Sequence, residues 1–482
     1  MAKLKHIIKQ LSQQDYENIY EQLVKSSADK SALLLKVLRE KHHNDAKLME
    51  ELDVNTNAYY TLRSRLNQKI EEYLLQQMES PRTDLLKKVA NINEVIFTKK
   101  KAISIATLKK LEKELLDYDL SNELTIIYKT LKRLHIHSPE YYHYSQMYNK
   151  HVSCMLAIDK AEDILAEYFK KYGLYTLSGD PNERAELGML AQEIENIARL
   201  YTSHRLFVYQ NCLTVFHRLF VEPEDVVGDN QEPIEDILNK IEQIFEQYYL
   251  DSVYFHLRLV VEFLRLEYYT HYKVYRKAEK YFEEINQDIA LLLSNYTLYT
   301  FPAQFLQTKL ERSIRLNIAH ELYEECERVF EEIELDKEDV PRYLNYVMFR
   351  ALACYYAEKY DEAARWINNL INEMTLKKYP LAMLDIKCIL ALQYCLMRDN
   401  DLFAQLMSSI QRQIRLMGKE ECEDIFLFTK ILKIAVSEVK RDKPQKIKGY
   451  ANRLQNLQRK RGFNPIRFIV IDDKLIQKLC HE

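Results

Sequence analysis

The chain has 482 residues, of which only 7 are Gly and 10 are Pro. Average usage would give about 58 residues of these two types. Tight turns, β-bulges and phosphate-binding loops depend on them, so β-sandwiches, β-barrels and Rossmann enzymes are disfavoured. Long helices joined by short turns are favoured instead. The net charge is −3, and residues 440–467 alone carry 10 Lys and Arg against one Asp, so a basic segment follows an acidic body.

The 8 Cys residues are widely spaced and form no CxxC pair, a pattern typical of reduced thiols. The first residues turn polar too soon for a secretory signal peptide. No run of about 18 apolar residues is present, which predicts that the chain does not span a membrane. These features together predict a cytoplasmic protein with no membrane partner.

Residues 31–78 have the periodicity of three helices, and Asn55 is placed to cap the third of them. Five residues fall at the apolar positions of a helix-turn-helix, and Asp53 holds the turn position where Gly is usual: Leu48, Leu52, Val54, Tyr59 and Leu62. The segment resembles that DNA-binding unit, in the manner of the last region of a sigma factor. The resemblance implies that the second helix enters a major groove. It places six residues on or near the exposed face: Asn57, Tyr60, Thr61, Arg63, Ser64 and Arg65.

A plain three-helix cap on the rest of the chain is the alternative for this segment. Residues 44–75 contain four Lys and Arg against six acidic residues, so the sequence shows no strong basic face. If the segment does contact nucleic acid, Arg63 and Arg65 are the side chains expected to meet bases or phosphate.

Helical periodicity continues from about residue 85 to 460. Segments 104–117 and 235–250 each place apolar residues on one stripe, and the polar gap 222–233 predicts an exposed loop. Segment 351–371 has small residues followed by larger apolar ones at helical spacing: Ala351, Cys354, Tyr360, Ala363, Ile367 and Leu370. Segment 266–285 repeats this spacing with Tyr269, Tyr275, Ala278, Phe282 and Ile285. Weaker copies centre on Ala161, Cys326 and Ala404.

These segments resemble tetratricopeptide repeats with lengthened helices. The resemblance implies an all-α, right-handed superhelical stack of antiparallel helix pairs. It also implies a groove that binds peptide or protein segments. From helix phase, we expect four residues to line that groove: Asn345, Arg350, Tyr355 and Tyr394.

Two interpretations fit the basic stretch 440–465. Its Lys and Arg side chains, with Tyr450 between them, could contact phosphate, or a helix over 448–459 could neutralise the acidic stack. The β-branched run 466–471 predicts either a lone strand or an extended segment.

Signals of catalysis are missing from the sequence. The pairs His42-His43 and His135-His137 lack further ligands at useful spacing, and no Walker A, GxGxxG or GxSxG motif occurs. Cys388 and Cys395 share a helix face, where buried packing is favoured over redox pairing or zinc binding. We therefore expect no enzyme activity, no cofactor and no metal.

The sequence thus predicts three parts: a helical domain over 1–80, a helix stack over 81–465, and an extended segment with a short helix over 466–482. The leading functional hypothesis is a non-enzymatic scaffold that binds protein segments. The alternative is a DNA-binding transcriptional regulator whose helix stack receives a signal or partner. The sequence leaves the oligomeric state open.

Overall fold

The computed structural model describes residues 4, 7–8, 11, 13–26, 28–40, 48–49, 52–77, 81–222, 231–248, 252–287, 303–330, 337–374, 376–437, 442–457 and 462–480. Within these ranges the chain forms 22 α-helices and two short 3₁₀ helices, and no strand. The all-α prediction is therefore confirmed. The described residues divide into two compact units, one within Met1–Ser145 and one from Gln146 onward.

The first unit begins with α2 (Gln13–Lys25), α3 (Asp29–Glu40) and α5 (Thr56–Gln77). The helices expected near 31 and 57 are confirmed, whereas most of the middle one falls in residues that the structure does not describe. Their shared core includes Ile19, Leu23, Leu34, Leu35, Leu38, Tyr59, Leu66 and Ile70. The Tyr73 hydroxyl donates a hydrogen bond of 3.2 Å to Asp15 Oδ1 and ties α5 to α2.

Two residues, Asp53 and Asn55, set the turn before α5. Asp53 has φ of 48°, so it adopts the left-handed conformation for which Gly is usual. Asn55 Oδ1 accepts a hydrogen bond of 2.9 Å from the Ala58 amide, which satisfies a donor of the first helical turn. The predicted cap is thus confirmed.

Four further helices complete the first unit: α6 (Pro81–Ala90), α7 (Ile92–Thr98), α8 (Lys101–Asp117) and α9 (Ser121–Leu134). The predicted apolar stripe of 104–117 lies on α8, where Leu108, Leu111 and Leu115 are buried. α8 packs along α9 and also contacts α6 and α7.

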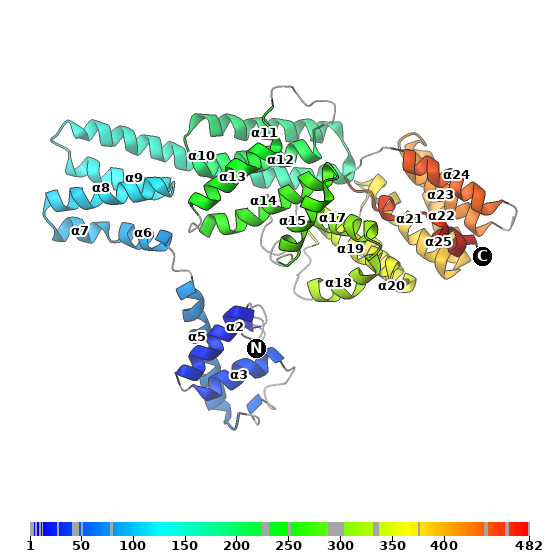
Figure 1. The fold of residues 1–482 in the computed structure, drawn as a ribbon, viewed down its shortest axis with the longest axis horizontal. Helices are drawn as coiled ribbons and strands as arrows, with labels where there is room; N and C mark the ends of the chain where they lie inside the picture. Colours follow the sequence, from blue (N-terminus) through cyan, green and yellow to red (C-terminus); the bar gives the residue numbers. More distant parts are fainter. Residues whose placement is uncertain are drawn as a thin grey trace. The chain divides into compact units, whose positions relative to one another are not determined.

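The long helix α10 (Glu140–Ser178) begins in the first unit and continues into the second. Consecutive helices of the second unit then pack in pairs, consistent with a helical repeat stack (Figure 1). The first of them are α11 (Pro181–Leu200), α12 (His204–Phe220), α13 (Ile234–Gln247), α14 (Ser252–His271), α15 (Tyr275–Gln287) and α17 (Ala303–Arg315). The later ones are η2 (Ala319–Glu321), α18 (Leu322–Phe330), α19 (Val340–Tyr356), α20 (Tyr360–Glu373), α21 (Pro380–Met397), α22 (Asn400–Met417), α23 (Glu423–Val436), α24 (Lys443–Asn456), η3 (Pro465–Phe468) and α25 (Asp473–Cys480).

Four of the repeat segments predicted from sequence bury the small residue at their centre. Segments 351–371 and 266–285 form the helix pairs α19–α20 and α14–α15. The exception is the copy centred on Ala404, because Ala404 and Leu402 are exposed on α22. The core face of that helix is instead formed by Phe403, Met407 and Ile410, one residue out of the expected phase. Most of the predicted loop 222–233 lies outside the described residues.

The helix ends account for the scarcity of Gly, because residues of other types hold the left-handed positions there. Within the described residues, the left-handed conformation occurs at two glycines, Gly179 and Gly418, and at seven residues of other types. Those seven are Asp53, Asp119, Lys273, Asn317, Glu358, Arg398 and Asp442. Most of these residues follow a helix C-terminus, the position at which Gly is strongly preferred.

Helix α21 is long and apolar enough to cross a membrane by length and composition, yet 67% of it is buried inside the protein. It packs against α20, α22 and α23. A helix that is apolar on all sides is expected at the centre of a large core. Its composition is accounted for by this position in the helix stack.

Candidate functional site

The C-terminal segment lies across the helix stack. We call residues 462–472 the strap, and we call the surface of α17, α19 and α21 that contacts it the docking face. The strap contains η3, continues in extended conformation over 469–472, and leads into α25. Figure 1 shows it, in red, beside α21, with which η3 is in contact.

Of the two interpretations of the run 466–471, the lone strand is wrong, and the extended segment holds for its second half. Pro465 begins a 3₁₀ turn that ends at Phe468, and no described strand is available to pair with this run. The apolar residues bury their side chains against helices instead. Ile466 and Phe468 are only 3% and 6% exposed.

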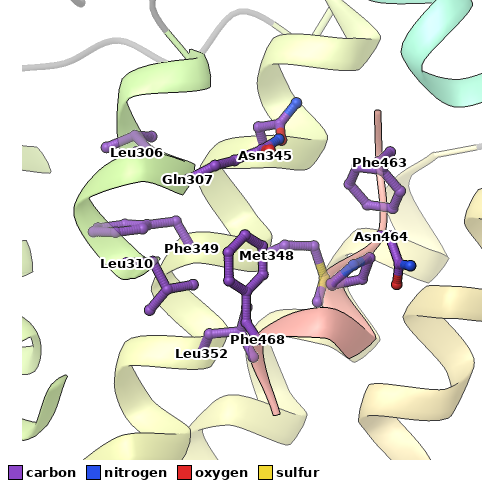
Figure 2. A pocket seen from close by; sticks show the side chains of 11 residues that line it. Leu306, Gln307, Leu310, Asn345, Met348, Phe349, Leu352, Phe463, Asn464 and Phe468 are labelled. Carbon is purple, nitrogen blue, oxygen red and sulfur yellow. The ribbon is translucent and has the colours of Figure 1, made fainter. Parts of the chain in front are cut away.

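An apolar socket in the docking face receives the strap (Figure 2). Helix α17 contributes Leu306 and Leu310, and α19 contributes Met348, Phe349 and Leu352. Phe463, Pro465 and Phe468 enter from the strap, and Figure 2 shows Phe468 pointing toward α19. A cavity of about 20 Å³ remains, which is room for roughly one water molecule.

Two hydrogen bonds hold the backbone of the strap. The Phe463 amide donates to the carbonyl oxygen of Thr176 on α10 over 2.9 Å. The Tyr356 hydroxyl donates to the carbonyl oxygen of Phe468. Gly462 fits here because of a close approach, since an added Cβ would lie 2.7 Å from Thr176 Cβ. The first turn of the strap therefore requires a residue without a side chain.

Cations of the C-terminal segment meet acids of the stack. Arg467 Nη2 lies 2.9 Å from Glu311 Oε1 and donates to Gln307 Oε1 over 3.0 Å. Lys478 Nζ lies 2.6 Å from Glu358 Oε1, and Lys474 Nζ lies 3.5 Å from the same oxygen. The hydrogen bond from Lys478 holds the pKa of Glu358 below its usual value. The acidic stack is thus neutralised in part by its own C-terminus.

An open hollow of about 660 Å³ lies beside the strap. Tyr355, Tyr356 and Tyr360 line it together with His320, Asp472 and Lys478. Burial raises the pKa of the Tyr355 hydroxyl well above its ordinary value, so this group stays protonated and serves as a neutral hydrogen-bonding group. The hollow is aromatic with charged groups of both signs at its rim.

The structure brings two of the four expected groove residues to this site. Asn345 lines the socket, is buried, and is hydrogen bonded to Gln307 and to the carbonyl oxygen of Pro341. Tyr355 lines the open hollow. The other two contact α20: Arg350 lies 4.4 Å from the ring centre of Trp366, and Tyr394 accepts a hydrogen bond of 2.9 Å from Asn368.

The residues expected to meet nucleic acid lie on two adjacent stripes of α5. Tyr60, Arg63 and Ser64 line a hollow of about 440 Å³ together with Asn67 and Glu71. Thr61 and Arg65 are exposed on the neighbouring stripe. The guanidinium of Arg63 is 5.7 Å from the ring centre of Tyr59 and 5.9 Å from that of Tyr60. The side chain of Asn57 lies outside the described residues.

Sequence reasoning missed the residues that hold the strap, which are Thr176, Gln307, Glu311 and Tyr356. It also missed Glu358, which pairs with lysines of α25. The available signal was the mostly apolar run 463–471, which follows a basic helix. In the basic stretch itself, Lys448 Nζ lies 2.6 Å from Asp473 Oδ1. No group of three or more His, Cys, Asp or Glu side chains within the described ranges is arranged to hold a metal ion.

No family model, curated protein or solved structure matches this chain. Functional inference therefore depends on the geometry of the docking face and of α5.

Proposed function

We propose that this protein is a non-enzymatic scaffold that binds extended segments of other proteins on its docking face. The proposal depends on one observation: the docking face already holds a short segment of this chain, which contains a 3₁₀ turn, by contacts to its backbone and side chains together. Bonds to the backbone give affinity for any extended chain, and sockets give specificity. Both kinds of contact are present on α17 and α19.

The resemblance to tetratricopeptide repeats supports the same role, because repeat stacks present long binding surfaces. The hollow beside the strap adds about 660 Å³ of open space lined by tyrosines. Tyrosine rings contribute large contact area at low cost in side-chain entropy. We propose that protein segments are bound there and that the protein acts in the cytoplasm.

Site-specific photo-crosslinking tests this function. A photoreactive residue replaces His320, which is exposed in the hollow, or Met189, which is 64% exposed on α11. The full-length protein is illuminated in native lysate, with and without nuclease. We expect discrete protein adducts from position 320 that resist nuclease and are absent from position 189. Identical adducts from both positions would contradict the proposal.

A second function is favoured by the geometry of α5. The left-handed Asp53 and the Asn55 cap are consistent with the turn that the helix-turn-helix resemblance implies, and Arg65 is exposed on the helix that follows. We therefore propose, as the alternative, a DNA-binding regulator whose α5 enters a major groove. The acidic Glu71 beside Arg63 in the same hollow weighs against phosphate binding there.

Duplex DNA binding tests this alternative. We expect an affinity that falls steeply as salt rises, because phosphate contacts release counterions. The double variant Arg63→Ala/Arg65→Ala should lose binding, whereas Lys25→Ala, an exposed cation on α2, should not. Absence of any DNA binding at low salt would exclude the regulator.

A further inference from the structure

We propose that the strap is an intramolecular ligand, and that the partner of the docking face is a short segment with the same chemistry, including the 3₁₀ turn, that replaces it. This inference rests on the proposed scaffold function. The required segment has an aromatic residue at each end, a Pro two positions after the first and an Arg just before the second. In this chain the pattern is Phe463-Asn464-Pro465-Ile466-Arg467-Phe468.

The contacts of the strap are ones that a segment of another protein could also make. The Phe463 amide and the Phe468 carbonyl are backbone groups, which every peptide segment offers. The aromatic side chains and Pro465 line the socket together with residues of α17 and α19, and η3 also contacts α21. The docking face is formed by helices outside the strap, so the same surface is available to another segment when the strap leaves.

The negative charge of the docking face favours a partner segment that carries a basic residue. Glu311 on the stack is paired with Arg467 of the strap. Replacement of the strap by a neutral segment would leave Glu311 without Arg467. Arg312 does not compensate Glu311, because its guanidinium is bound to Glu279 and lies 4.1 Å from the ring centre of Phe282. An Arg in the partner restores the lost interaction.

The strap is also attached in a way that permits exchange. Helix α25 is anchored separately, since Leu475, Ile476 and Leu479 are buried and α25 packs against α21, α23 and α24. The strap can thus leave the socket while α25 keeps the C-terminus nearby. Tethering gives the strap a high effective concentration, so that only a partner with matching contacts replaces it.

Gly462 provides a variant that opens the site without altering the docking face. In Gly462→Val the side chain would meet Thr176, including its backbone Cα at 2.8 Å, and the strap must lift. Gly449→Ala is the matched control, since nothing lies within 4 Å of a Cβ added on α24. Arg467→Glu is a second opening variant, because Arg467 is exposed and Glu311 would repel the new carboxylate.

The probe is a fluorescent synthetic peptide with the sequence of residues 460–472, and its binding to the full-length chain is measured by anisotropy. We expect both opening variants to bind at least ~10-fold tighter than the wild type and Gly449→Ala, because the competing strap is weakened. A peptide with Glu in place of Arg467 should bind Gly462→Val at least ~10-fold more weakly. It should regain affinity for Gly462→Val/Glu311→Arg.

Equal peptide affinity of the opening variants and the controls would overturn the inference. So would a dimer that forms with rising concentration in Gly462→Val, measured by sedimentation, because the occupant would then be a second copy of this chain. If position 320 gives adducts but the opening variants and the controls bind the peptide equally, the scaffold function is supported and the strap is not an intramolecular ligand. Tight peptide binding without such adducts would remove the scaffold function instead.

Discussion

Helix α5 of the first unit carries its candidate contact residues at the surface, whereas helix α19 of the second unit carries them among buried residues. α5 buries a single stripe that includes Tyr59, Leu66 and Ile70, and the described side chains among its candidate DNA-contact residues are exposed or half-buried. α19 buries 13 of its 17 residues, and the docking-face residue Asn345 is one of them. Function and folding can thus be separated by mutation on α5, whereas on the docking face one side chain often serves both.

The largest expected effect is seen when the same substitution, Leu→Ala, is made on a buried helix and on a surface helix. Leu392 on α21 is fully buried, and Leu392→Ala should lower the free energy of unfolding by about 2–5 kcal/mol. Leu74→Ala on α5 should change it little, because Leu74 is 37% exposed. Trp366 is the one Trp of the chain, so its fluorescence in a urea titration reports the second unit alone.

Circular dichroism of both variants provides the control, since it follows helices of both units. Equal loss of stability in Leu392→Ala and Leu74→Ala would break the contrast between core helix and surface helix.

Local patterns predicted the helices because helix formation is decided by neighbours three and four residues away. The stripe of Leu108, Leu111 and Leu115 and the cap by Asn55 were visible for this reason. The phase of α22 was missed because Phe403 and Ala404 are both apolar, and only tertiary packing decides between them.

The covered docking face could not be predicted, because its contacts are distant in sequence. Arg467 and Gln307 are 160 residues apart. An apolar run such as 466–471 fits a strand, an extended segment or a turn equally well until its neighbours are known. The predicted groove position of Asn345 followed from helix phase, but nothing local indicated that the strap would cover it.

The next effect concerns a buried acid in the second unit. Burial raises the pKa of Glu267 to about 8, although the hydroxyl of Thr308 donates a hydrogen bond to it. At low pH Glu267 is protonated in both states. As the pH rises above its ordinary pKa, only the unfolded chain releases this proton, so stability falls until the folded pKa is reached.

Glu267→Gln removes this proton release and should be more stable than the wild type at pH 8, by up to ~3 kcal/mol, with little difference at pH 4. Urea titrations followed by Trp366 fluorescence at the two pH values measure it. An unchanged difference between variant and wild type across this range would show that Glu267 titrates at its ordinary pKa in the folded state.

A smaller effect is expected at the turn of the first unit. Asn55→Ala removes the acceptor for the Ala58 amide and should lower the stability of the first unit by about 1 kcal/mol. Hydrogen exchange of the amides of α5 measures this locally, and those of α21 should not respond. Asn55→Asp keeps a capping oxygen and is the matched control. Faster exchange in both variants would mean that the side chain acts other than as a cap.

The smallest expected effect tests whether the left-handed residues of the two units are set by the same cause, which is the backbone conformation of the turn. Asp53 precedes α5 and Lys273 follows α14, with φ of 48° and 57°. The Val274 amide donates to the carbonyl oxygen of Tyr269 over 2.8 Å, the hydrogen bond that a Gly after a helix normally supports. If the backbone alone sets both turns, Lys273→Gly and Asp53→Gly should each stabilise their unit by roughly 0.5–1 kcal/mol. Thermal unfolding and local hydrogen exchange measure the two gains, and a loss at Asp53 with a gain at Lys273 would show that the Asp53 side chain itself stabilises the turn before α5.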